Sequence, residues 1–210
     1  GKTGEQLATA SALNTQTEYG ADVIMRANYS LEHGADELST CIRVLLKKLI
    51  RKLCTEASKE PEDIYQVSVV GNTCMHHLFL GIVPDSLVHA PYNPAISQGL
   101  TFPAEKFRLG IHPGGQLIAL PVIAGFVGAD TVACLLAVNL EDEKKMTLMI
   151  DIGTNGEIVL GNAKRRIACS TAAGPAFEGA KIACGMRGAE GAIEHAYLEN
   201  GKLVCKVIGD

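Results

Sequence analysis

Residues 147–170 contain three short runs of strand-forming residues separated by tight turns, and this pattern restricts the chain to folds with an antiparallel sheet. The first turn contains two glycines, and the second begins with Gly161-Asn162. Because apolar residues flank the first turn on both sides, we expect a buried strand that delivers Asp151 to its end. The three runs are Thr147–Ile150, Glu157–Leu160 and Arg166–Ser170.

The rest of the chain alternates between short apolar runs and helical patterns, which predicts a mixed α/β protein. Glu199-Asn200-Gly201-Lys202 indicates a second hairpin, because Asn-Gly is typical of a type I′ turn. We expect residues 84–115, which hold five of the eight prolines, to be irregular. The other expected strands are at residues 7–12, 67–70, 117–120 and 203–208, and the expected helices are at about 19–31, 36–58, 73–81, 125–139 and 175–184.

The clearest helix runs from Asp36 to about Ser58. Its apolar residues recur at three- and four-residue steps and form one stripe. Asp36 and Glu37 in the first turn carry the negative charge that suits the start of a helix dipole. We interpret the basic residues on the other side as a solvated face. They are Arg43, Lys47, Lys48, Arg51 and Lys52.

The composition is that of a globular chain, with 210 residues, 47% of them hydrophobic and 20% charged, and a net charge of −4. No apolar run reaches the roughly 18 to 20 residues of a membrane helix, so we expect no membrane partner. A pI near 5.9 and the absence of tryptophan argue against nucleic-acid binding. Seven cysteines without CxxC spacing predict small core residues in a reducing cytoplasm rather than a disulfide framework.

The turn after Asp151 carries the residue types that phosphate binding needs. Gly153 and Gly156 let backbone N–H groups approach an anion, while Thr154 and Asn155 add hydroxyl and amide donors. An aspartate beside phosphates suits Mg²⁺, which is held through one or two carboxylates while it keeps several waters. The alternative is a β-hairpin whose glycines satisfy only the geometry of the turn.

The residues Asp-Ile-Gly-Thr-Asn-Gly-Glu at 151–157 resemble the second phosphate motif of the superfamily that contains actin, sugar kinases and heat-shock chaperone ATPases. Three further segments extend the resemblance over nearly the whole chain and make it more specific. Together they are similar to the ATP-dependent reductive activators of corrinoid proteins. The three segments are Val69–His77, Ala124–Ala133 and Ala173–Ala180.

This resemblance implies an α/β fold of two ribonuclease-H-like lobes with ATP in the cleft between them. Residues 1–144 would form the first lobe without its N-terminal strands, and residues 145–210 would begin the second. The charged stretch at residues 141–145 is the expected boundary. We expect the first phosphate motif before residue 1 and the adenosine motif after Asp210, so both lobes are expected to be incomplete.

The resemblance also implies a function. Proteins of this family carry a [2Fe–2S] domain near the N-terminus, and no cysteine set in this chain matches such a cluster. They use ATP and Mg²⁺ to drive the reduction of cobalt from Co(II) to Co(I) in a partner corrinoid protein. We therefore expect an ATP-binding segment that is inactive alone, with the cluster only in the full-length protein. A homodimer is compatible with this interpretation.

Site residues follow from the resemblance position by position. Asp151 and Asp130 would be the catalytic carboxylates that hold Mg²⁺ through water, one from each lobe. The phosphate turn would consist of Gly153, Thr154, Asn155 and Gly156. The other nucleotide contacts would be Asn72 and Thr73 toward the γ-phosphate, Gly174 at the nucleotide, and Glu178 and Lys181 at the ribose.

Several of these roles have simpler alternatives. Asp130 could be a partner of the helix dipole, and Asn72 could be a helix cap. Glu178 and Lys181 could form a surface ion pair, because they lie three residues apart on one helix face. Two other functions also remain open: an ATP-dependent kinase or radical-enzyme activator of the same superfamily, and a non-catalytic module that holds a protein partner.

Overall fold

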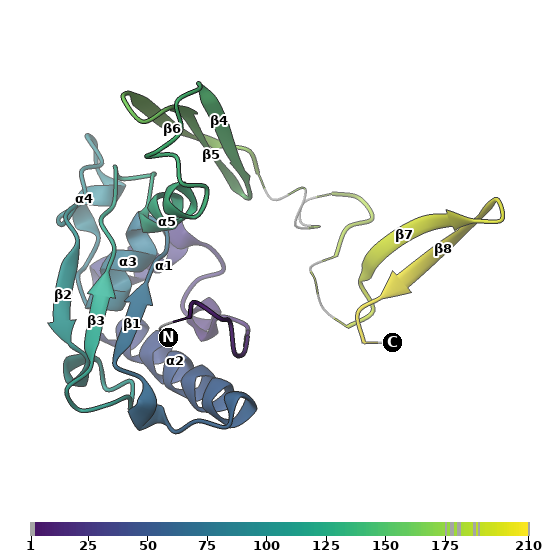
Figure 1. The fold of residues 1–210 in the computed structure, drawn as a ribbon. Coiled ribbons are helices and arrows are strands. Elements are labelled where there is room, and N and C mark those ends of the chain that lie inside the picture. Colours follow the sequence, from purple (N-terminus) through teal and green to yellow (C-terminus); the bar gives the residue numbers. More distant parts are fainter. Residues whose placement is uncertain are drawn as a thin grey trace. The chain divides into compact units, whose positions relative to one another are not determined.

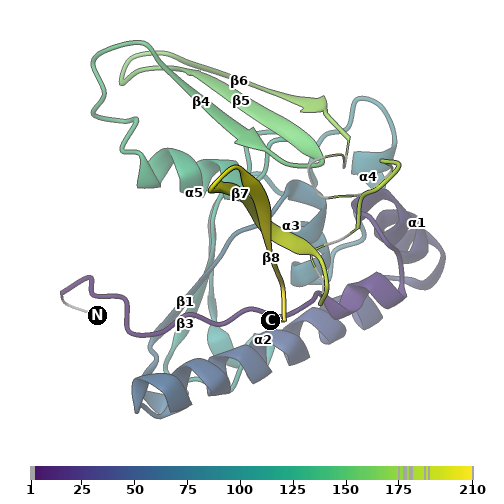
Figure 2. The same cartoon turned by 90° about the vertical axis from the view of Figure 1, so that its right-hand side faces the viewer.

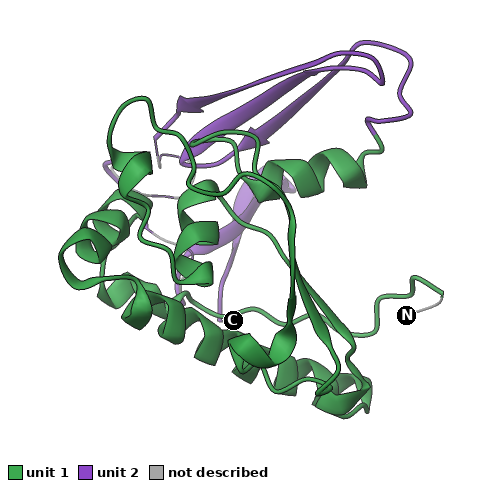
Figure 3. Cartoon of the chain, turned by 90° about the vertical axis from the view of Figure 1, so that its left-hand side faces the viewer, with its two compact units in different colours: residues 1–139 green, residues 140–210 purple. Residues whose placement is uncertain are grey.

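The computed structural model describes residues 3–174, 176, 179, 182–186, 188 and 190–209 of the chain. The chain divides into two compact units, Gly1–Asn139 and Leu140–Asp210, which Figure 3 shows in different colours. Within the described residues, no helix has both the length and the apolar character that crossing a membrane requires.

The first unit contains a mixed three-stranded sheet with the strand order β1-β3-β2 (Figure 1). Strand β1 runs parallel to β3, and β2 runs antiparallel to β3. The strands are β1 (Gln66–Val69), β2 (Leu100–Pro103) and β3 (Gln116–Ala119). The helices are α1 (Val23–His33), α2 (Asp36–Ala57), α3 (Thr73–Leu80), α4 (Asp85–Val88) and α5 (Ala129–Ala137), and the 3₁₀ turns are η1 (Thr15–Glu18), η2 (Pro61–Asp63) and η3 (Ala104–Phe107).

The main core of this unit joins the sheet to helices α2 and α3. Ile50 of α2 and Phe79 of α3 are buried in one cluster with Leu117 of β3. The ring of Phe79 stacks on that of Phe107 with 5.2 Å between the ring centroids. Burial of these apolar side chains fixes the position of η3 against the two helices.

Helix α2 is the longest helix in Figure 2, and its observed bounds agree with the predicted ones almost to the residue. It begins at Asp36 and ends at Ala57, followed by Ser58 in the left-handed conformation. The interpretation of its basic side as solvated is wrong for Arg43. Both Nε and Nη2 of that side chain donate to the carbonyl oxygen of Phe79, over 3.1 and 2.6 Å.

Other predictions in this unit need correction. Residues 7–12 form no strand, because no described strand pairs with them. The helix expected at 19–31 is found at Val23–His33, after Asp22, whose side chain caps it. The helix expected at 125–139 begins only at Ala129. The stretch expected to be irregular, residues 84–115, contains α4, η3 and strand β2. Strand β2 ends at Pro103, where a backbone donor is missing.

The second unit confirms the predicted hairpins. Strands β4 (Thr147–Ile152), β5 (Asn155–Gly161) and β6 (Arg166–Ala172) form an antiparallel sheet in the order β4-β5-β6. Strands β7 (Ile193–Glu199) and β8 (Lys202–Val207) form the second hairpin. Its turn residues Asn200 and Gly201 both have positive φ, at 51° and 74°, as a type I′ turn requires. Half of the helix predicted at 175–184 falls outside the described residues, and the described residues 182–184 form a bend and a turn rather than a helix.

The prediction that β4 is a buried strand is wrong, because none of its residues is buried and Asp151 near its end is exposed. Leu148, Ile150 and Ile152 are 56%, 53% and 68% exposed. They share a face with their register partners on β5, where Leu160 is also exposed. The prediction treated the apolar run as a strand covered on both sides, whereas an antiparallel sheet can leave one face uncovered.

All seven cysteines lie among the described residues, and all are free thiols. Cys54 and Cys74 are buried, and burial raises the pKa of the Cys74 thiol to about 12. The prediction of core packing is wrong for Cys169, Cys184 and Cys205, which are exposed.

Candidate functional site

The turn between β4 and β5 is as tight as the sequence predicts. Gly153 and Thr154 connect the strands, and the N–H of Gly153 donates to the carbonyl oxygen of Asn155 over 3.1 Å. This bond occupies the Gly153 amide within the turn, so Gly153 shapes the turn rather than offering its N–H to a phosphate. Thr154 and Asn155 are both exposed, at the tip of the turn and the start of β5.

The structure brings Gly174 to this turn. Its N–H donates to the carbonyl oxygen of Thr154 over 2.8 Å. Gly174 has φ +85°, a conformation that side chains rarely adopt, although open space surrounds the position of an added Cβ. Two of the predicted nucleotide-binding segments, the turn and the stretch that contains Gly174, are therefore neighbours in space.

Gly156 has a packing role beside the turn. It is buried in β5, and an added Cβ would lie 3.4 Å from Cγ2 of Thr171 on β6. That distance is at the short end of ordinary van der Waals contact, so a small residue suits this buried position.

A second carboxylate, which the sequence reasoning missed, lies opposite Asp151. In the register of the sheet, Asp151 of β4 pairs with Glu157 of β5, which pairs with Ser170 of β6. The hydroxyl of Ser170 donates to Oε1 of Glu157 over 2.9 Å and orients that carboxylate. The signal was present in the sequence, because the turn centred on Thr154 places residues 151 and 157 opposite each other.

Two like charges directly opposite each other on one sheet face repel, so this pair is costly without a counter-charge. A divalent cation supplies one, and Mg²⁺ is usually held through one or two carboxylates. Asp151 and Glu157 therefore fit the ligand chemistry of Mg²⁺. The described residues contain no group of three or more His, Cys, Asp or Glu side chains that could hold a metal.

Asn72 and Thr73 are the candidate nucleotide contacts in the first unit. Both form hydrogen bonds within that unit. Oδ1 of Asn72 accepts from the N–H of Met75 over 3.0 Å, which makes Asn72 the N-cap of α3. Thr73 is 1% exposed, and its hydroxyl donates to the carbonyl oxygen of Ala124 over 2.7 Å. These contacts match the helix-capping alternative for Asn72 and give Thr73 a structural bond.

Asp130 lies in the first turn of α5, close to Asn72. The N–H groups of Ala129 and Asp130 both point to the carbonyl oxygen of Gly71, over 3.0 and 3.3 Å. An added Cβ on Gly128 would lie only 2.6 Å from Cα of Asn72, so glycine is needed where β1 meets α5. Oδ1 of Asp130 accepts from the N–H of Thr131 over 2.9 Å. This position at a helix start suits a carboxylate by itself.

The structure thus gathers the candidate residues in two places. Asn72, Thr73 and Asp130 belong to the first unit, and the turn with Asp151 and Gly174 belongs to the second. Glu178 and Lys181 lie outside the described residues.

Two family models together cover nearly all of the chain. Residues 2–143 match the model described as the RACo middle region. Residues 145–210 match the model described as the C-terminal domain of RACo, the ASKHA domain.

Relatives with curated descriptions agree with these matches. The corrinoid activation enzyme RamQ of Eubacterium limosum is 43% identical over 201 residues, which cover 95% of this chain and 34% of RamQ. The [Co(II) methylated amine-specific corrinoid protein] reductase of Methanosarcina barkeri is 28% identical over 183 residues, 83% of this chain and 33% of the reductase. This chain spans about a third of the length of both relatives.

A solved structure matches nearly the whole chain. It is described as a reductive activator for a corrinoid, iron–sulfur protein, and it superposes with a TM-score of 0.86 at 39% identity. The match covers 99% of this chain and 34% of the solved one. The resemblance stated from the sequence is therefore confirmed, together with the mixed α/β fold. The chain belongs to the RACo family, with residues 2–143 matching its middle region and residues 145–210 its ASKHA domain.

Proposed function

We propose that this chain is the ATP-binding segment of a reductive activator that reduces Co(II) to Co(I) in a corrinoid protein. In this proposal the electron comes from a [2Fe–2S] cluster that this chain does not itself hold. ATP supplies the free energy for the uphill transfer. The support comes from the two family matches and from the descriptions of the two curated relatives and the solved structure.

The proposal that this chain binds a nucleotide rests on the pair of opposed carboxylates beside the tight turn. Asp151 and Glu157 would hold Mg²⁺, and Ser170 would keep the Glu157 carboxylate in place. Thr154 and Asn155 would face the phosphates from the end of the hairpin. Gly174, which is hydrogen-bonded to the turn, would let the nucleotide approach the backbone closely. Magnesium-bound ATP would supply the hydrolysable phosphate.

Further parts of the proposal rest on the sequence resemblance. Asp130 would approach the metal from the first lobe, and Glu178 and Lys181 would contact the ribose. Asn72 and Thr73 would support that lobe rather than touch the γ-phosphate, because their polar groups bond to Met75 and Ala124. The lobe boundary at residue 144, a homodimer, a cytoplasmic location and the absence of nucleic-acid and membrane partners stay predictions. The kinase and the non-catalytic alternatives gain no support from the relatives.

Substitution Asp151→Asn in the full-length protein tests the proposal. We expect a large loss of Mg²⁺-dependent ATP hydrolysis and of Co(I) formation, measured by phosphate release and by the absorbance of the corrinoid. Glu194→Gln is a matched control, because it removes one exposed carboxylate from another strand of the same unit. Full ATP hydrolysis by the Asp151→Asn protein would remove Asp151 from the mechanism.

A further inference from the structure

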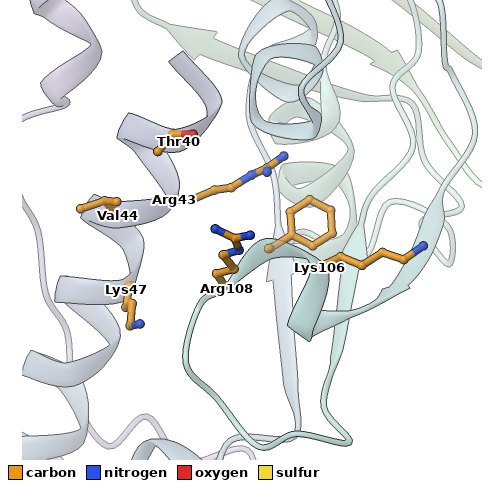
Figure 4. Close-up of a pocket in the computed structure, with 7 residues that line it drawn as sticks. Thr40, Arg43, Val44, Lys47, Lys106 and Arg108 are labelled. Atoms are coloured by element: carbon orange, nitrogen blue, oxygen red, sulfur yellow. The ribbon is translucent and has the colours of Figure 1, made fainter. Parts of the chain in front are cut away.

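A hollow of about 410 Å³ in the first unit is lined by basic side chains, although the chain as a whole carries a net charge of −4. It lies between helix α2 and the region of η3 (Figure 4). Its lining includes no acidic residue. The residues that matter are the cations Arg43, Lys47, Lys106 and Arg108 and the apolar side chains Val44 and Phe107.

Arg43 holds a fixed position in this hollow. Its two hydrogen bonds to the carbonyl oxygen of Phe79 orient the guanidinium, whose central carbon lies 4.7 Å from the ring centroid of Phe107. A guanidinium held over aromatic rings loses little further freedom when it binds an anion. The guanidinium has five N–H donors, so its two hydrogen bonds to one carbonyl oxygen leave other donors available for an anion.

Two of the other cations are placed by local structure, Arg108 through its backbone and Lys47 through packing of its stem. Arg108 has φ +53° at the end of η3, and its N–H donates to the carbonyl oxygen of Glu105 over 3.0 Å. The stem of Lys47 packs over Gly110, where an added Cβ would lie 3.1 Å from Cε of Lys47. In the described part of the chain, the ion pairs are Lys52 with Glu56 and His89 with Asp85, so none involves Lys47, Lys106 or Arg108.

A second hollow of about 450 Å³ adjoins the first and shares Lys47 and Arg108 with it. It continues past Glu105 and Gly110 to His112. We call the two hollows together the basic groove. A groove with two adjoining hollows and two shared cations suits an extended chain that carries several negative charges better than one small anion. The exposed side chain of Val44 suits the methylene groups of glutamate.

We propose that the basic groove docks an acidic segment of a protein partner. Carboxylates of the segment meet Arg43, Lys47 and Arg108, and its aliphatic carbons lie against Val44. The charge of the groove is complementary to such a segment and would also speed the encounter. All of these residues lie in the first unit and none belongs to the phosphate turn, so this proposal stands independently of the proposed function.

The test uses the full-length protein and a fluorescein-labelled peptide of ten glutamates, followed by fluorescence anisotropy. We expect saturable binding that weakens as salt is raised, because exposed charges are screened. The double substitution Lys47→Glu and Arg108→Glu should weaken binding about tenfold or more, because two attractive charges become repulsive. The neutral pair Lys47→Gln and Arg108→Gln should give a smaller loss and covers the case in which charge reversal impairs folding.

The matched control is the double substitution Lys164→Glu and Arg165→Glu, which changes the net charge equally in an exposed turn of the second unit. It should leave peptide affinity within about twofold, because general charge effects on an exposed surface are small. Equal weakening by the control and the groove variants would overturn the proposal. Tighter binding of inorganic phosphate, or of a DNA duplex, at the same residues would also overturn it.

Discussion

His77 of α3 is held as one neutral tautomer by backbone groups. Its Nδ1 lies 2.7 Å from the carbonyl oxygen of Thr73 and therefore donates to it, while its Nε2 accepts from the N–H of Ala95 over 3.1 Å. The side chain is fully buried. Protonation of Nε2 would set two donors against each other, so His77 ties α3 to the loop before β2 only while it is neutral.

Stability should therefore depend on pH below neutrality. Burial lowers the pKa of His77 below 6.5, and it lowers that of the buried His76 as well. Since a histidine in the unfolded chain titrates near 6.5, the unfolded state binds more protons below that pH. We expect an unchanged Tm above about pH 7 and a falling Tm as the pH drops from about 6.5 toward the lower folded-state pKa.

Thermal unfolding followed by circular dichroism from pH 8 to pH 5 measures this dependence. His77→Gln is the comparison, because glutamine stays uncharged over this range. The variant should show a smaller loss of Tm on acidification, even if its Tm at pH 8 is lower. An identical pH profile in parent and variant would contradict the role given to His77.

Glu157 allows a sharper test of the metal site than Asp151 alone. If both carboxylates hold Mg²⁺, Glu157→Gln should raise the Mg²⁺ concentration for half-maximal ATP hydrolysis by about 10- to 100-fold. Without metal, the same substitution removes a repulsive pair and should leave stability unchanged or slightly higher. Titration of Mg²⁺ in the ATPase assay and urea unfolding in EDTA measure the two effects. A purely structural Glu157 would instead lose stability in EDTA without a change in Mg²⁺ dependence.

At the scale of elements, the junction between β1 and α5 depends on one close approach. The N–H groups of Ala129 and Asp130, in the first turn of α5, donate to the carbonyl oxygen of Gly71, which lies two residues after the end of β1. Gly128 makes room for this contact, because an added Cβ would lie 2.6 Å from Cα of Asn72 and 2.7 Å from the oxygen of Gly71. The backbone atoms that it would meet cannot move without displacing one of the two elements.

Gly128→Ala should therefore destabilise the protein by about 1–3 kcal/mol through overpacking. Gly71→Ala is the matched control, because its Cβ would meet only Cβ of Met75 at 3.8 Å, an ordinary contact. Urea unfolding of the two variants measures the difference in the free energy of unfolding. Equal stability of both variants would show that the junction can relax.

At the scale of the whole molecule, the candidate carboxylates come from different units. Asp130 lies in the unit Gly1–Asn139 and Asp151 in the unit Leu140–Asp210. The family assignment also depends on both units, since one family model matches each part. The chain spans about a third of each matched relative, so the Asp151→Asn experiment is designed for the full-length protein.

Local patterns predicted the elements whose residues interact with near neighbours. The bounds of α2 follow from a three-to-four-residue apolar period, and the β7–β8 turn follows from Asn200-Gly201. The β4–β5–β6 order follows from two short turns. The prediction of a strand at residues 7–12 was wrong, because a strand needs a pairing partner and the local sequence does not specify one. Strand β2 was not predicted because Pro103 is unfavourable in a strand pattern. Only the pairing of this segment with β3 stabilises it as a strand.

By itself, the sequence determined the long helix α2, the tight turns, the residue types of the phosphate turn and the family. Only the tertiary structure decided which side chains meet across the sheet and which faces are buried. It set Glu157 opposite Asp151, tied Gly174 to Thr154 and placed Arg43 over the ring of Phe107. Turns and helix caps depend on residues a few positions apart, whereas these contacts depend on strand register and helix packing, which no short segment specifies.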